Sequence, residues 1–122
     1  MAALNSRLAA AKARLDTLDL YPEPVRLDRI RVLVIPWVFR LPRMRRYGGY
    51  ALRRTILLKR PTASDDLLTH ELCHIWQMQH RPWAAMWAWL TTSYRENPFE
   101  REARAAVAAT ATSAGDARDG AG

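Results

Sequence analysis

LLTHELCHIWQMQH, the stretch at residues 67–80, holds all three histidines of the chain. Within it, residues 70–74 match the pattern HExxH, in which two histidines one helical turn apart enclose a glutamate. At about 100° per residue, His70, His74 and Gln77 share one face of a helix. The apolar residues occupy the opposite face: Leu68, Leu72 and Ile75. The stretch therefore predicts a helix with one polar face and one face for the core.

The flanking residues predict where this helix begins and ends. Residues 61–66 read PTASDD, a proline break followed by Ser and Asp cap candidates and by acidic side chains suited to a helix N-terminus. Pro82 ends the pattern because proline lacks the backbone N–H that a continuing helix needs. We expect a helix at about 65–80.

The HExxH residues have the chemistry of a catalytic zinc site. His70 and His74 can each offer a ring nitrogen to one tetrahedral Zn²⁺. Glu71 stands to one side of them, where it can take a proton from a zinc-bound water and later pass it to a leaving amine. The alternative is a structural histidine pair, because a five-residue pattern also occurs by chance.

A catalytic zinc takes three protein ligands, so a third must come from elsewhere. His80 has the spacing of the last histidine in HExxHxxGxxH, but Gln77 replaces the glycine at which that chain turns. Without the turn, the helix should carry His80 away from the metal. Glu100, at the start of a following helix, can approach from the side. We expect His70, His74 and Glu100 as ligands, with His80 as the alternative third ligand.

Apolar periodicity and chain breaks divide the remaining sequence into short elements. We expect an amphipathic helix at 4–19, strands at about 29–40 and 50–58, a short tryptophan-rich helix at 83–93 and a glutamate helix at 98–109. The fold class is then α+β, with a small antiparallel or mixed sheet packed on the helix at 65–80. We expect one domain at 1–109 and a disordered tail at 110–122.

Two predicted strands raise the question of how they pair. Pro36 favours an edge position or a bulge in the first strand, because it cannot donate a ladder hydrogen bond. Residues 47–50, YGGY, supply a turn before the second strand. A hairpin-like pair with a basic connection is the simplest arrangement.

The tryptophan-rich helix has large apolar side chains at helical spacing: Trp83, Met86, Trp87 and Leu90. This pattern favours a wedge of core packed on the active-site helix. Docking to a membrane or to a partner is the alternative.

Positive charge is concentrated in one part of the chain. The formal net charge is +7, and residues 40–60 carry eight basic side chains and no acidic one. Such a segment can bind an anionic partner, which can be nucleic acid, anionic lipid or an acidic protein. The alternative is a solvated arginine face.

Cysteine content and hydropathy indicate a cytoplasmic protein without a transmembrane segment. The single cysteine, Cys73, excludes an intramolecular disulfide, and we expect it to be a small buried residue beside the site. The N-terminus lacks the apolar run of a signal peptide. The most apolar run, residues 83–90, is far shorter than the roughly 20 residues that span a bilayer.

HELCHIWQ followed by YRENPFEREA, in residues 70–77 and 94–103, resembles the gluzincin metallopeptidases, especially the small single-domain minigluzincin-like group. The resemblance implies a zincin-like domain in which Glu100 is the third ligand and the strand at 50–58 pairs with an extended peptide. It also suggests Tyr94 as a residue that helps to stabilise the oxyanion, and a packing role for Tyr94 is the favoured alternative. Many gluzincins place an aspartate, which orients a ligand histidine, where this chain has Arg104. That departure implies a weaker site.

These motifs predict a zinc-dependent metallopeptidase that hydrolyses peptide bonds of a peptide or protein substrate, with Glu71 as general base. One alternative is a regulatory protease like ImmA and IrrE, which acts on a DNA-binding repressor and also has HExxH. The other is a non-catalytic, zinc-stabilised basic binding module.

Overall fold

The computed structural model describes residues 2–42, 44–45, 47–52, 54–93 and 96–110. These residues form an α+β fold with a three-stranded mixed sheet, which confirms the expected fold class. The helices are α1 (Ala2–Asp16), the 3-10 helix η1 (Pro36–Arg40), α2 (Asp65–His80), α3 (Pro82–Thr91) and α4 (Pro98–Thr110). The strands are β1 (Arg31–Val34), β2 (Gly49–Leu52) and β3 (Thr55–Leu58).

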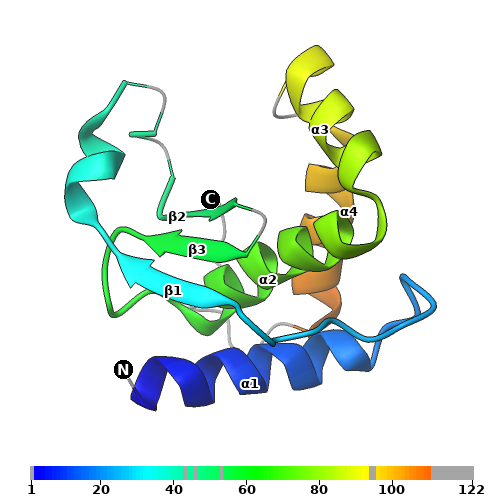
Figure 1. Ribbon diagram of the computed structural model, residues 1–122, viewed down its shortest axis with the longest axis horizontal. Helices are drawn as coiled ribbons and strands as arrows, with labels where there is room; N and C mark the ends of the chain where they lie inside the picture. The colour runs from blue at the N-terminus through cyan, green and yellow to red at the C-terminus, as the bar shows by residue number, and fades with distance from the viewer. Residues whose placement is uncertain (1, 43, 46, 53, 94–95, 111–122) are drawn as a thin grey trace.

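Helix α2 lies at the centre of the fold (Figure 1). In that view α1 runs along the bottom, the sheet lies above it, and α3 and α4 stand on the other side of α2 from the sheet. The expected apolar stripe of α1 is buried at Leu4, Leu8 and Leu15. It joins Leu68 and Leu72 of α2 in one core cluster. The apolar face of α2 is therefore buried, as its periodicity predicted.

The bounds of α2 agree with the sequence prediction. Ser64 is the N-cap, and its hydroxyl accepts a hydrogen bond from the backbone N–H of Leu67 at 3.0 Å. Asp65 and Asp66 occupy the first turn, where the helix dipole favours negative charge. Arg7 of α1 donates to the Asp65 carboxylate at 3.0 Å and so ties the start of α2 to α1.

The predicted strand at 50–58 is wrong in one respect, because it is two strands. Leu52 of β2 pairs with Thr55 of β3, so the chain reverses between them and β2 and β3 form an antiparallel hairpin. The residues between are Arg53 and Arg54, which lack the Asn-Gly type of turn signal. The two-residue reversal shifts the alternation of side chains by one: Ala51 pairs with Ile56 and shares its face, whereas Leu52 is exposed, although one continuous strand would place Leu52 on the face of Ile56.

The predicted strand at 29–40 is also only partly correct. Its first half is β1, but Pro36 starts η1, where the fixed φ of proline and its missing N–H suit a first helical position. Strand β1 pairs parallel with β3 rather than as a hairpin. The order is β1-β3-β2, so β3 is central and the turn proposed at 47–50 lies partly within β2.

Helix α3 contradicts the prediction of a core wedge. Its buried residue is Ala88, whereas Trp83, Trp87 and Trp89 are 77%, 69% and 57% exposed. Helix α4, in contrast, packs through Phe99, Ala103, Ala106 and Val107. The tail predicted at 110–122 begins inside α4 at Thr110, and residues 111–122 lie outside the described part of the chain.

Candidate metal centre

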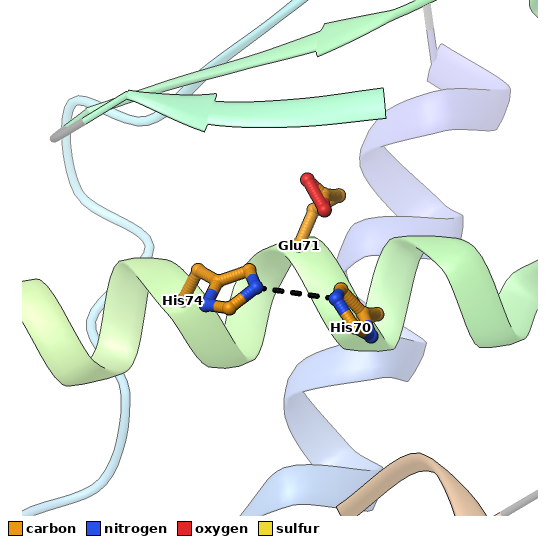
Figure 2. A group of neighbouring side chains, drawn as sticks. All are labelled: His70, Glu71 and His74. Carbon is orange, nitrogen blue, oxygen red and sulfur yellow. Dashed lines mark hydrogen bonds between the residues drawn. The ribbon is translucent and has the colours of Figure 1, made fainter. Parts of the chain in front are cut away.

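Three side-chain atoms from α2 and α4 converge on one point. The Nε2 atoms of His70 and His74 are 3.1 Å apart, and the Glu100 Oε1 atom lies 3.1 Å from the first and 3.0 Å from the second. Figure 2 shows the two imidazoles side by side along α2. The two histidines come from adjacent turns of one helix, and Glu100 comes from the first turn of another.

This triangle fits a metal better than it fits hydrogen bonding alone. Ligands of a tetrahedral zinc at about 2.05 Å are separated by roughly 3.3 Å, close to the three distances seen. Two neutral imidazoles that face each other through Nε2 can place only one hydrogen between them. Two imidazoles and one carboxylate are also a known donor set of catalytic zinc. The residues present therefore fit a metal ion.

Glu71 also belongs to the group of potential ligands. His70, Glu71 and His74 each offer a ligand atom, and these atoms lie within 4.8 Å of one another. This group could hold a metal ion. The Oε1 atom of Glu100 lies 3.1 Å from His70 Nε2 and 3.0 Å from His74 Nε2, so Glu100 offers a further donor atom to the same position.

The start of α4 is held in register with α2 by buried polar contacts. The Asn97 side-chain oxygen accepts from the Phe99 N–H at 2.9 Å and caps the helix. The Gln77 side-chain nitrogen donates to the Phe99 carbonyl at 2.8 Å. These contacts place Glu100, the next residue, opposite the histidine pair.

Gln77 also orients His74. Its side-chain nitrogen donates to Phe99 and, at 3.1 Å, to Glu102, so its oxygen faces His74 and accepts from Nδ1–H at 2.8 Å. A metal would bind His74 Nε2 only after that atom has lost its proton, and the acceptor at Nδ1 then keeps the remaining proton on Nδ1. Glu102 is in turn fixed by the Tyr21 hydroxyl, which donates to it at 2.6 Å.

We therefore expect a Gln77→Leu variant to bind zinc about 10- to 100-fold more weakly, because His74 loses the acceptor that selects its tautomer. Competition with a chromophoric chelator measures this affinity. The matched control is Gln79→Leu, two residues along the same helix, where the side chain bonds only to the backbone of Arg26. Equal affinities in the two variants would contradict the role of Gln77.

No described residue orients His70 through Nδ1 as Gln77 orients His74. Its Nδ1 atom is buried and has no hydrogen-bond partner among the described residues. Burial is the largest cause of the lowered pKa of His70. The charge of Arg104, which lies nearby, lowers this pKa as well. A guanidinium can only donate, so it cannot accept a hydrogen from Nδ1 as an aspartate would. The two ligand histidines are therefore oriented unequally.

Glu71 is buried under the sheet. Its side chain is 1% exposed and points from α2 toward the strands (Figure 2). A methyl group on Gly49 of β2 would lie 3.3 Å from the Glu71 Cγ atom, so glycine permits this close approach. The Oε2 atom of Glu71 is buried, and no described residue forms a hydrogen bond with it. The pKa of Glu71 is raised to about 8: burial is the largest cause, the charge of His74 opposes it and the charge of Glu100 adds to it.

The ligand side chains influence one another's protonation. Burial raises the pKa of Glu100, but hydrogen bonds from His70 and His74 lower it more, to about 2. Burial lowers the pKa of His74, but the hydrogen bond and charge of Glu100 raise it to about 9. Glu100 is therefore an ionised carboxylate, the form in which it binds a metal.

A cleft of about 970 Å³ opens beside the ligands, between β2 and α3. Glu71, His74 and Glu100 line its floor, while His70 lies beneath and is fully buried. The walls are mostly apolar and aromatic: Tyr47, Tyr50, Leu52, Met78, Trp83, Met86, Trp89 and Phe99. Strand β2 is at the edge of the sheet, so its outer backbone groups face this side of the molecule.

The remaining predicted residues fall in different places. Tyr94 lies outside the described residues. His80 stacks on Tyr21, with ring centroids 5.2 Å apart and planes 3° apart, and so is engaged away from the ligand triangle. Cys73 is buried, as expected, and burial raises the pKa of its thiol to about 12.

Two residues of the site were not assigned a role from the sequence. Gln77 could have been found, because the helical wheel places it on the ligand face. Tyr50 could not, because its position on the cleft wall depends on the reversal between β2 and β3.

Comparisons with protein-family models, with curated proteins and with solved structures find no match for this chain. The gluzincin resemblance therefore stays an expectation that rests on the two sequence motifs.

Proposed function

We propose that the protein is a zinc-dependent peptidase. The observation that carries this proposal is the convergence of His70 Nε2, His74 Nε2 and Glu100 Oε1 within 3.1 Å of one another, with the Glu71 carboxylate beside them. A structural metal site is usually closed by four protein ligands, whereas three ligands next to an open cleft are typical of catalytic zinc.

Zinc bound there would supply a Lewis acid that polarises a carbonyl and lowers the pKa of water. Glu71 would act as the general base once the charge of a bound zinc lowers its raised pKa: its carboxylate accepts a proton from the attacking water and then donates it to the leaving amine. Burial beneath Gly49 keeps this carboxylate in one place and away from bulk water. His70, His74 and Glu100 hold the metal, and Gln77 keeps His74 in the binding tautomer.

The cleft suits an extended peptide. The free edge of β2 offers backbone donors and acceptors along one wall, and a peptide strand could add to it. Apolar side chains from α3 form the opposite wall. His74 and Glu100 line the floor between these walls, where a carbonyl of such a peptide would lie.

Zinc content and hydrolysis by the purified wild-type protein test the proposal. We expect about one zinc per chain, together with chelator-sensitive cleavage of a fluorescent casein or a mixed peptide library. Zinc without any cleavage would favour the non-catalytic module. Cleavage confined to a DNA-binding repressor would favour the regulatory protease. A protein that binds no zinc and cleaves nothing would refute the assignment.

A further inference from the structure

A surface helix usually buries its large apolar side chains and exposes polar ones. Helix α3 exposes its large apolar side chains instead. At about 100° per residue, Trp83, Met86, Trp87 and Leu90 share a face roughly 100° wide. All four are exposed, and the residue that α3 buries is Ala88. The helix thus turns alanine toward the protein and its largest apolar side chains toward solvent.

The exposed area is large for a protein of this size. With about 200 Å² for the side chain of a fully exposed tryptophan, the three tryptophans of α3 expose on the order of 400 Å². This is the range in which the largest apolar patch on a monomer is often functional. The cleft does not account for it, because Trp87 and Leu90 are not among the residues that line the cleft.

A second exposed apolar group lies on and just after η1, on the other side of β2 from α3 (Figure 1). Trp37 of η1 is 64% exposed, and Leu41 directly after η1 is exposed as well. Figure 1 places η1 and α3 in the upper half of the molecule, on either side of the sheet edge and opposite α1. We define the rim as two apolar residues of the η1 segment and the four residues on the exposed face of α3: Trp37, Leu41, Trp83, Met86, Trp87 and Leu90. Trp89 is exposed as well but lies outside that face.

The two chain segments that carry the rim contain basic residues but no acidic ones. Arg40 and Arg45 are exposed next to Trp37 and Leu41. Neither residues 29–64 nor residues 72–95, which include both rim segments, contain an aspartate or a glutamate. Tryptophan beside basic side chains is the composition that settles at the boundary between lipid headgroups and acyl chains, and anionic headgroups complement the arginines.

We propose that the rim docks the protein on the surface of an anionic lipid bilayer. The protein lies on the bilayer and does not cross it: α3 has ten residues, and no helix in the described part of the chain is long and apolar enough to span a membrane. Trp83 and Met86 belong to both the rim and the cleft wall, so docking turns the mouth of the cleft toward the lipid surface. A nucleic-acid interface would instead be polar and phosphate-directed, unlike α3.

Vesicle co-sedimentation of the full chain tests this proposal without any assay of peptidase activity. We expect binding to phosphatidylcholine vesicles that contain phosphatidylglycerol, weaker binding to phosphatidylcholine alone, and a blue shift of tryptophan emission on binding. Because the rim tryptophans are exposed, Trp83→Ser/Trp87→Ser should fold normally and bind at least about tenfold more weakly. Arg40→Glu/Arg45→Glu should lose at least about tenfold in binding to the anionic vesicles.

The control is Arg26→Glu/Arg31→Glu, the same charge change at exposed arginines outside the rim, which should keep more of the binding than Arg40→Glu/Arg45→Glu. Absence of vesicle binding by the wild type would overturn the proposal, as would undiminished binding by the tryptophan variant.

Light scattering tests whether a second copy of the chain covers the rim instead. If the wild type is a dimer, the tryptophan variant is a monomer and neither binds vesicles, a second copy covers the rim and the proposal is overturned. Salt-sensitive DNA binding with no vesicle binding would overturn the proposal in favour of nucleic acid.

Discussion

In a Glu71→Gln variant we expect zinc to stay bound while peptide hydrolysis falls by about 10²- to 10⁴-fold, the usual contribution of a general base. Glutamine has the same shape as glutamate but cannot take a proton from water at neutral pH. The proposed ligands are His70, His74 and Glu100, so loss of zinc is not expected in this variant. The measurements are metal content by mass spectrometry and the initial rate on a fluorescent peptide.

Glu96→Gln is the matched control for this substitution, because Glu96 is exposed and precedes α4. It should have wild-type zinc content and a wild-type rate. Unchanged hydrolysis in Glu71→Gln would show that Glu71 is not the base. If Glu71→Gln lost its zinc, the carboxylate would be a ligand, and the site would be the group of His70, Glu71 and His74.

Removal of a residue that only orients a metal ligand weakens metal binding by about 10- to 100-fold. Because Glu100 is a proposed ligand itself, Glu100→Ala should weaken zinc binding by more than this. Only the two histidines of the triangle would remain, and His70 Nε2 and His74 Nε2 would lose the carboxylate oxygen at 3.0–3.1 Å from each of them. Chelator competition measures the affinity, and circular dichroism checks that α4 still forms. Hydrolysis should disappear with the metal.

His80→Ala is the decisive comparison for the third ligand. Since His80 stacks on Tyr21, its removal should leave zinc binding close to that of the wild type. The opposite pattern, with zinc kept in Glu100→Ala and lost in His80→Ala, would mean that the third ligand is the histidine of the HExxHxxGxxH spacing.

Local sequence patterns predicted the helices well. Ser64 caps α2 at the predicted position, Pro82 follows its end, and Pro98 begins α4. These signals are reliable because helical hydrogen bonds and caps join residues three or four apart, so the information lies within a few residues. The same holds for the ligand face of α2, which depends only on helical periodicity.

The sheet was less predictable. Pairing of β1 with β3 joins residues more than 20 positions apart, as in Val32 with Ile56, and no local pattern encodes that partner. The reversal between Leu52 and Thr55 carries no turn signal. The outward face of α3 was missed for a related reason: helical spacing of large apolar residues indicates a shared face but not whether that face meets the core or solvent.

By itself, then, the sequence determined an α+β chain with HExxH on a capped helix and a glutamate at the start of a later helix. Tertiary structure decided that Glu100 meets both histidines while His80 stacks on Tyr21, because only the packing of α4 on α2 sets those distances. It also decided that Gln77 orients His74 whereas His70 Nδ1 has no such partner among the described residues. Side chains that are distant in sequence come within hydrogen-bond reach only when the core beneath them is packed.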